Sequence, residues 1–297
     1  MKKALFQLHV AVFLFGFTGI LGKLITLNEG LLVWYRMAIT VITLFIILKW
    51  KQELKLVSKP LFFKLLFIGF IISIHWVCFF GSIKYSNVSI ALTCFSSTGL
   101  FTSFIEPFFF KKKIAFSEVL LGILGISGIY IIFHFDPQYK TGIILGILAA
   151  VLSALFSVMN KKIVDTKTQS TQTIVFYEMF GGVLFLTLFM PFYFHQFLPS
   201  HIIPTVSDTF WLLILSWLCT ILAMNLMLKS LEKMSAFTQN LSLNLEPVYG
   251  IIMAFIFFKE NELLSSQFYF GFGLILFAVI LQMFRVIKSP FKPFIKN

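Results

Sequence analysis

Charged side chains are scarce in this sequence. Asp, Glu, Lys and Arg together make up 12% of its 297 residues, whereas hydrophobic residues make up 59% and 40 residues are Phe. No soluble globular protein has this balance, and apolar runs of about 18 residues or more recur along the whole chain. The composition excludes a soluble domain and predicts an all-α polytopic membrane protein.

Cysteine is rare as well, and the familiar catalytic motifs are missing. Cys78, Cys94 and Cys219 lie inside apolar runs and form no CxxC pair, so no disulfide or metal site is predicted. The sequence contains no HExxH, GxSxG or Walker motif. We therefore expect no catalytic residue, no metal, no cofactor and no coupling to ATP hydrolysis.

Ten apolar runs are each long enough to form a membrane-spanning helix, because about 20 apolar residues at helical rise cross the hydrocarbon core. The first run follows Lys2 and Lys3, and we expect it to be retained because no A-x-A-like cleavage site follows it. The predicted spans are approximately Leu5–Gly22, Leu31–Leu48, Phe63–Ile83, Val88–Phe110, Ser117–Phe133, Ile143–Met159, Thr173–Phe194, Thr209–Leu228, Ala236–Phe258 and Phe268–Phe284.

The distribution of positive charge predicts the orientation of these spans. The formal net charge of +12 would suggest nucleic acid in a soluble protein, but here Lys and Arg lie in short loops and in the tail. If the N-terminus is cytoplasmic, most of them fall on the cytoplasmic side, and the outer loops contain only Lys84, Lys140 and Lys259. We therefore expect a multi-pass protein of the bacterial inner membrane with both termini cytoplasmic, and no nucleic-acid partner.

The two halves of the chain resemble each other. Residues 82–113 align with residues 230–261 without a gap, and Tyr35-Arg36-Met37 is echoed by Tyr177-Glu178-Met179. Because each half contains five predicted spans, an odd number, the second copy is inverted relative to the first, an arrangement common in transporters. We expect one repeat over residues 1–139, a second over residues 140–288, and a basic cytoplasmic tail over residues 289–297.

The stretch Ala236–Phe258 is the most unusual span, because its first half is rich in polar residues. Glu246 lies about 15 Å along this helix, near the bilayer midplane, where an ionisable side chain is a functional-site hypothesis by default. Pro247 leaves the carbonyl of Leu243 without its helical partner. We interpret the stretch as a central helix that lines a pathway; the alternative is that its polar residues form interhelical hydrogen bonds. The predicted site residues here are Gln239, Asn240, Ser242, Asn244, Glu246 and Tyr249.

Further site residues are expected on other spans. His75 and Trp76 lie near the middle of the third span, although a lone His on an apolar helix is often only hydrogen-bonded to a neighbour. The spans that begin near Val88 and Ala236 carry clusters of Ser, Thr and Asn, so we expect them to form most of a central cavity. The remaining residues predicted at this cavity are Ser97, Thr98 and Tyr177.

Two more charged residues fall inside predicted spans. Arg36 and Glu178 lie only about five residues from the ends of their spans, close enough for long side chains to reach the membrane interface. We therefore expect them to anchor loops or to pair structurally, outside the site.

The chain resembles members of the drug/metabolite transporter superfamily of the EamA type. The residues that carry the resemblance are Ser230-Leu231-Glu232-Lys233-Met234-Ser235-Ala236, Leu245-Glu246-Pro247 and Lys259-Glu260. The first half departs from this pattern, since Thr98-Gly99 stands where the second half has Glu246-Pro247. The resemblance implies a secondary transporter that moves a small organic metabolite, an amino acid or similar solute, by efflux or exchange. The implied partners are that solute and the lipid bilayer, with a homo-oligomer possible.

Two other functions are weighed against transport. A membrane-embedded enzyme would use His75 and Glu246 as acid and base on a lipid-linked substrate. A channel is disfavoured, because selectivity filters show repeated carbonyl loops or rings of charge. Within the transporter reading, three roles stay open for the Glu246 carboxyl: coupling to protons, binding a cationic group of the substrate, or a structural hydrogen bond.

Overall fold

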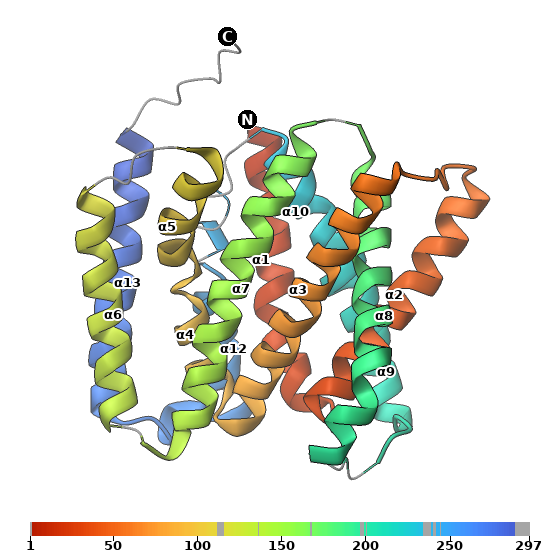
Figure 1. Ribbon diagram of the computed structural model, residues 1–297. Helices are drawn as coiled ribbons and strands as arrows, with labels where there is room; N and C mark the ends of the chain where they lie inside the picture. Colours follow the sequence, from red (N-terminus) through yellow and green to blue (C-terminus); the bar gives the residue numbers. More distant parts are fainter. Residues whose placement is uncertain are drawn as a thin grey trace.

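The computed structural model describes residues 2–111, 116–135, 137–166, 168–196, 199, 201–233, 239, 242–243 and 245–288. Within these residues all regular secondary structure is helical and there is no β-strand, which confirms the predicted all-α class (Figure 1). In chain order the elements are α1 (Lys2–Leu24), α2 (Glu29–Trp50), α3 (Lys59–Tyr85), α4 (Val88–Phe95), α5 (Thr98–Phe110), α6 (Phe116–Phe135), η1 (Pro137–Tyr139), α7 (Lys140–Val164), α8 (Thr171–Gln196), α9 (Val206–Ser216), η2 (Trp217–Leu222), α10 (Ala223–Leu231), α12 (Glu246–Phe258), η3 (Glu260–Glu262) and α13 (Ser266–Lys288).

The chain is a multi-pass membrane protein by the length and composition of its helices. Among the described residues, seven helical segments are long and apolar enough to cross a bilayer. Three shorter apolar helices, Leu120–His134, Glu246–Phe258 and Ser266–Ala278, accompany them. The total of ten spans stays a prediction, because much of the first part of the predicted ninth span lies outside the described residues.

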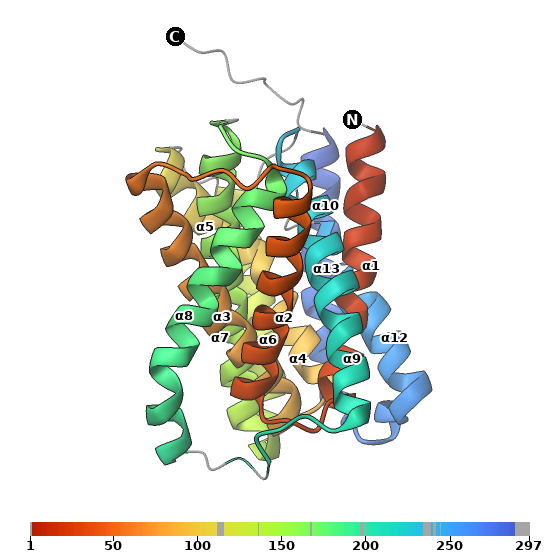
Figure 2. The same cartoon turned by 90° about the vertical axis from the view of Figure 1, so that its right-hand side faces the viewer.

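The helices form one bundle with distinct edges. Helices α6 and α13 pair at one edge, and α2, α8 and α9 lie toward the other, with α1, α3 and α7 between them (Figure 1). Large apolar side chains such as Phe6 and Ile42 are exposed on the outside, as expected for surfaces that contact lipid. The start of α1 and the end of α13 lie at the same end of the bundle (Figure 2).

The fourth predicted span is broken near its middle, between α4 and α5. The hydroxyls of Ser96, Ser97 and Thr98 donate to the carbonyl oxygens of Thr93 (2.6 Å), Cys94 (2.6 Å) and Phe95 (2.7 Å), respectively. In a bilayer the carbonyls freed by a break must be satisfied within the protein. These hydroxyls therefore make the discontinuity possible at membrane depth.

In the second half, α12 begins at Glu246, and much of the earlier part of the predicted span Ala236–Phe258 lies outside the described residues. Pro247 thus lies in the first turn of α12, where a missing N–H removes no helical hydrogen bond. Helices α5 and α12 each contain 13 residues and occupy matching positions in the alignment of residues 82–113 with 230–261. Each ends at a lysine in the left-handed conformation, Lys111 (φ 52°) and Lys259 (φ 51°).

The pairing of α6 with α13 is reciprocal. A Cβ atom on Gly128 would lie 2.5 Å from the carbonyl oxygen of Gly271, and one on Gly271 would lie 2.6 Å from the carbonyl oxygen of Gly128. The same two contacts with roles exchanged are what a two-fold relation between neighbours produces. The two backbones approach this closely because neither glycine has a side chain.

Candidate functional site

A cavity of about 50 Å³ lies among the central helices. Its walls come from both halves of the chain, with α1, α2, α3 and α4 from the first and α7, α10 and α12 from the second. Most of the lining is apolar, and its large side chains are Phe15, Phe79, Phe95, Phe156, Met224 and Met227. Two lining residues, Arg36 and Glu246, carry opposite charges.

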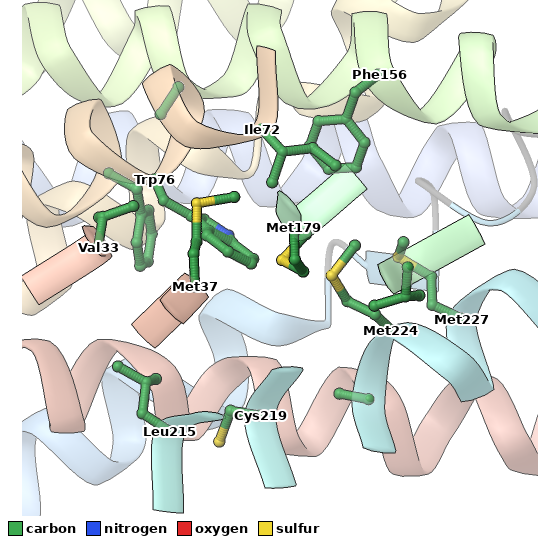
Figure 3. Close-up of a cluster of buried hydrophobic side chains, with 14 of the residues drawn as sticks. Val33, Met37, Ile72, Trp76, Phe156, Met179, Leu215, Cys219, Met224 and Met227 are labelled. Carbon is green, nitrogen blue, oxygen red and sulfur yellow. The ribbon is translucent and has the colours of Figure 1, made fainter. Parts of the chain in front are cut away.

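Methionine and tryptophan side chains make the interior adaptable. Figure 3 shows Met37, Met179, Met224 and Met227 gathered with Trp76 between the helices. Unbranched thioether side chains adjust to irregular shapes, and an indole offers a broad flat face. A cavity bordered by such groups suits an apolar body of more than one shape.

Arg36 on α2 is completely buried, and the bundle holds its guanidinium in place. Its Nε donates to Oγ1 of Thr220 (2.7 Å), and its Nη2 donates to the carbonyl oxygen of Cys219 (3.2 Å). The guanidinium carbon lies 3.6 Å from the centroid of the Trp76 ring, a cation–π contact. Nη1 has no hydrogen-bond partner. One donor nitrogen is therefore left for a ligand.

A local change of helix type supplies the partners of Arg36. Between α9 and α10 the backbone forms the π-helical turn η2 (Trp217–Leu222), which contains Cys219 and Thr220. The Thr220 hydroxyl donates to the carbonyl of Leu215 (2.9 Å), so its oxygen is oriented to accept from Arg36. Short π-helical turns inside longer helices occur often at functional sites, and here the turn positions a buried cation.

Glu246 is the first residue of α12 and is 4% exposed. Helix α1 passes close by, since a Cβ atom on Gly16 would lie 3.1 Å from the carbonyl oxygen of Glu246 and one on Gly250 would lie 3.1 Å from that of Gly16. Arg36 and Glu246 interact electrostatically across the cavity. They form no ion pair with each other within the described structure. The cavity thus presents a cation and an anion that are not joined.

His75 and Trp76 come from α3, as predicted for the cavity wall. Nδ1 of His75 lies 2.8 Å from the carbonyl oxygen of Ala149. Because a carbonyl only accepts, Nδ1 carries the proton, and in the neutral ring Nε2 is the acceptor. The His75 ring also packs against Phe95 and Phe156, with ring centroids 5.5 Å and 5.4 Å away. His75 is therefore oriented by the backbone and by aromatic neighbours.

Other predicted site residues lie elsewhere. Ser97 and Thr98 bond to backbone carbonyls at the break between α4 and α5, and neither lines the cavity. The Tyr177 hydroxyl donates to the carbonyl of Lys55 (3.1 Å), also away from the cavity. Tyr249 packs edge-on against Phe13 of α1.

The polar stretch before α12 is described only in part. Gln239 is buried, and neither atom of its amide has a hydrogen-bond partner, whereas Ser242 is half-buried. Neither is among the lining residues. Asn240 and Asn244 lie outside the described residues. Among the described residues, the spans that begin near Val88 and Ala236 supply Phe95, Leu243 and Glu246 to the lining, and α3 supplies His75, Trp76 and Phe79. Because much of the first part of the ninth span lies outside the described residues, it stays a prediction that these two spans form most of the cavity.

The expectation that Arg36 lies outside the site is wrong, because Arg36 is fully buried and lines the cavity. Glu178 is also fully buried rather than at the end of the bundle, and it is not among the lining residues. Depth along one helix does not determine exposure when neighbouring helices cover that end. A usable signal was present in the sequence, since each residue stands in the same Tyr-x-Met context in its half.

No group of three or more His, Cys, Asp or Glu side chains that could hold a metal occurs in the part of the chain that the structure describes.

Comparisons with known proteins agree with the two-fold organisation. A family model described as the EamA-like transporter family matches residues 2–134 and residues 140–284, one match for each half. A solved structure titled "Crystal structure of protein" covers 97% of this chain and 99% of its own, with a TM-score of 0.68 and 14% sequence identity. At that identity the likeness shows the fold alone. A search of curated proteins finds no match.

Proposed function

The chain belongs to the EamA-like transporter family, and from this premise we propose that it is a secondary transporter of a small zwitterionic solute, an amino acid or a similar molecule. We place it in the bacterial cytoplasmic membrane and propose efflux or exchange as its direction. One observation supports the substrate class above all others: Arg36 and Glu246 border the same apolar cavity and are not paired. Members of this family are transporters, which agrees with the expected lack of a catalytic residue.

The cationic side of the cavity suits a carboxylate. Hydrogen bonds between guanidinium and carboxylate are among the stronger ones in proteins, and the planar fork of Arg favours this partner. Nε and Nη2 of Arg36 are occupied by Thr220 and Cys219, which fixes the plane of the group and leaves Nη1 free. A carboxylate at Nη1 would satisfy a buried donor whose desolvation is otherwise uncompensated.

The anionic side of the cavity suits an ammonium group. Glu246 is buried at the start of α12, and the cationic side chain that interacts with it is Arg36, across the cavity. An ammonium group placed between the two would pair with the Glu246 carboxylate, while its own carboxylate pairs with Arg36. One positive and one negative wall match a solute with no net charge, so the loaded cavity would be neutral. A solute with only one charge would leave one buried wall without a counter-charge, which is costly.

The apolar lining suits the remainder of the solute. Phe79, Phe95 and Phe156 surround His75, and Met224 and Met227 face them from α10. Apolar area removed from water contributes about 25 cal/mol per Å² to binding. We therefore expect amino acids with large apolar or aromatic side chains to bind more tightly than glycine or serine.

A thermal-shift screen of purified protein tests this proposal. A ligand that binds only the folded form raises the unfolding temperature by mass action. We expect stabilisation by phenylalanine and leucine, and little by phenethylamine or phenylpropionate, each of which keeps the ring and loses one charge. Equal stabilisation by the zwitterion and by either single-charge analogue would contradict the proposal.

We also propose that residues 1–139 and 140–288 are two inverted repeats. The support is the separate family match in each half and the reciprocal contact of Gly128 with Gly271. On this arrangement the cavity lies at the interface of the repeats, where transporters of this architecture bind substrate.

A further inference from the structure

A second buried polar pair lies outside the central cavity, between α7 and α8. Glu178 of α8 and Asn160 of α7 are both completely buried. The two side chains interact, but neither oxygen of the Glu178 carboxyl and neither amide atom of Asn160 meets hydrogen-bond geometry with any partner. Buried polar atoms without partners are rare in folded proteins and costly. Four such atoms in one pair indicate a ligand that completes the site.

Among the described residues, no cation balances Glu178. Helix α8 packs against α2, α3 and α10, and α7 packs against α3, α4, α5 and α10. Helices α4 and α5 contain no Lys, Arg or His. On these helices Arg36 is held by Thr220 and Cys219, His75 by Ala149, Lys161 by Asp165 and Leu231, and Lys84 by Ile25. The other lysines of these helices are exposed: Lys49, Lys59, Lys64, Lys140, Lys162 and Lys229. The Tyr177 hydroxyl donates to the backbone carbonyl of Lys55.

From this arrangement we propose that Glu178 is a proton-binding site, positioned by Asn160 and separate from the substrate cavity, and that it couples transport to protons. The inference rests on the proposed transport function. In an apolar interior a carboxylate without a counter-charge is costly, so the carboxyl binds a proton and becomes neutral. A proton is the smallest ligand that can neutralise it. One oxygen of Glu178 forms an O–H bond in the conformation described here, and the other remains an acceptor for the Asn160 amide.

The internal repeat indicates how this proton would be released. Arg36 on α2 and Glu178 on α8 stand in matching Tyr-x-Met contexts on the second helix of each half. Here Arg36 borders the cavity whereas Glu178 is packed away from it. In inverted-repeat transporters access alternates as one half moves against the other around a fixed site. If each half adopts the arrangement that the other has here, Glu178 takes the position beside the cavity. Its O–H bond then breaks, and the proton passes to cavity water.

The position of Asn160 supports a connection between the two sites. Ser153 and Phe156 line the cavity from α7, and Asn160 lies one turn beyond Phe156 on the same face of that helix. Close packing on α3 fixes the backbone of Glu178, because a Cβ atom on Gly69 of α3 would overlap the carbonyl oxygen of Glu178. Helices α7 and α8 both pack on α3, so a movement of α8 on α3 would change the position of the Glu178 carboxyl relative to Asn160 and the cavity.

Infrared spectroscopy tests the proton site directly. A protonated carboxylic acid has a carbonyl stretch that a carboxylate lacks. In lipid nanodiscs we expect such a band in the wild type, its loss on alkaline titration, and its absence in Glu178→Gln. Glu106→Gln, which alters another buried carboxyl, is the matched control and should leave the band unchanged. Asn160→Leu removes the neighbouring amide, so its band should persist to more alkaline pH. A titrating band that is identical in Glu178→Gln and wild type would overturn the proposal.

Transport in proteoliposomes tests the coupling. We expect substrate movement by the wild type to change the internal pH, and Glu178→Gln to exchange labelled substrate with no accompanying proton movement. Unchanged proton movement in Glu178→Gln, or coupling to sodium in its place, would contradict the inference. If no substrate moves in the wild type, the transport proposal fails while the infrared result still decides whether Glu178 holds a proton.

Discussion

At the scale of a residue, Gly69 determines how closely α3 and α8 approach. A Cβ atom at this position would overlap the carbonyl oxygen of Glu178 and lie 2.9 Å from the backbone nitrogen of Gly182. Both obstacles are backbone atoms, which cannot rotate away, so Gly69→Ala must separate the helices. We expect a loss of about 1–3 kcal/mol in the free energy of unfolding, measured as a lower unfolding temperature. Gly273→Ala is the control, because nothing lies within 4 Å of its added Cβ. Equal unfolding temperatures for the two variants would contradict this account.

The residue scale also shows where the sequence falls short. Glu246, His75 and Trp76 are predicted correctly as neighbours in space, because ionisable and amphipathic groups inside apolar runs need protein or water around them. Arg36 is misplaced by the same reasoning, since its nearness to a span end suggests an interface although η2 and Trp76 enclose it. Burial by other helices is a tertiary property, and periodicity within one helix does not contain it.

At the scale of an element, Glu260 of η3 contacts both α4 and α1 at the end of the bundle opposite the start of α1. Its carboxylate accepts from the backbone N–H groups of Val88 (3.1 Å) and Ser89 (2.8 Å), capping the first turn of α4. It also accepts from the Ser89 hydroxyl (2.7 Å) and pairs with Lys23 at the end of α1 (2.8 Å). A fully buried carboxylate that caps a helix of the other half joins the two repeats at this end.

Removing this carboxylate is expected to loosen the junction. Glu260→Ala leaves two N–H groups of α4 and the Ser89 hydroxyl unsatisfied, at a cost of about 1–3 kcal/mol for each buried group that water does not reach. We expect a lower unfolding temperature and faster hydrogen exchange in the first turn of α4. The control is Glu262→Ala, an exposed carboxylate two residues away. Unchanged exchange at Ser89 would count against a structural role for Glu260.

The elements themselves are predicted better than their irregularities. The repeat of residues 82–113 in residues 230–261 anticipates that α5 and α12 match in length and in their left-handed lysine ends. The break after Phe95 and the π-helical turn η2 are not predicted, because apolar periodicity is the same on both sides of each. Both irregularities depend on hydrogen bonds from a hydroxyl or a buried cation to backbone carbonyls. The positions of these groups are determined only when the helices pack together.

At the scale of the whole molecule, we predict the orientation of the bundle in the membrane. The charge distribution predicts that both termini are cytoplasmic, and the start of α1 and the end of α13 lie at the same end of the bundle (Figure 1). Single cysteines at the exposed positions Thr166 and Glu262, in a background without native cysteines, should react with an impermeant thiol reagent from opposite sides. We expect Thr166→Cys to be labelled from the cytoplasm and Glu262→Cys from outside. Labelling of both from one side would refute the topology.

The central claim is that Arg36 and Glu246 bind the two ends of one zwitterion, and calorimetric titration of charge-deleted variants tests it most directly. Loss of a hydrogen bond to a charged group costs about 1.5–3 kcal/mol, roughly a tenfold to hundredfold loss in affinity. We expect Arg36→Gln to lose that much affinity for phenylalanine and to bind phenethylamine as well as or better than the wild type does. Glu246→Gln should show the reverse, with weaker binding of phenylalanine and binding of phenylpropionate at least as tight as in the wild type. A result in which both variants weaken all three ligands equally, or neither changes the preference, would contradict the account.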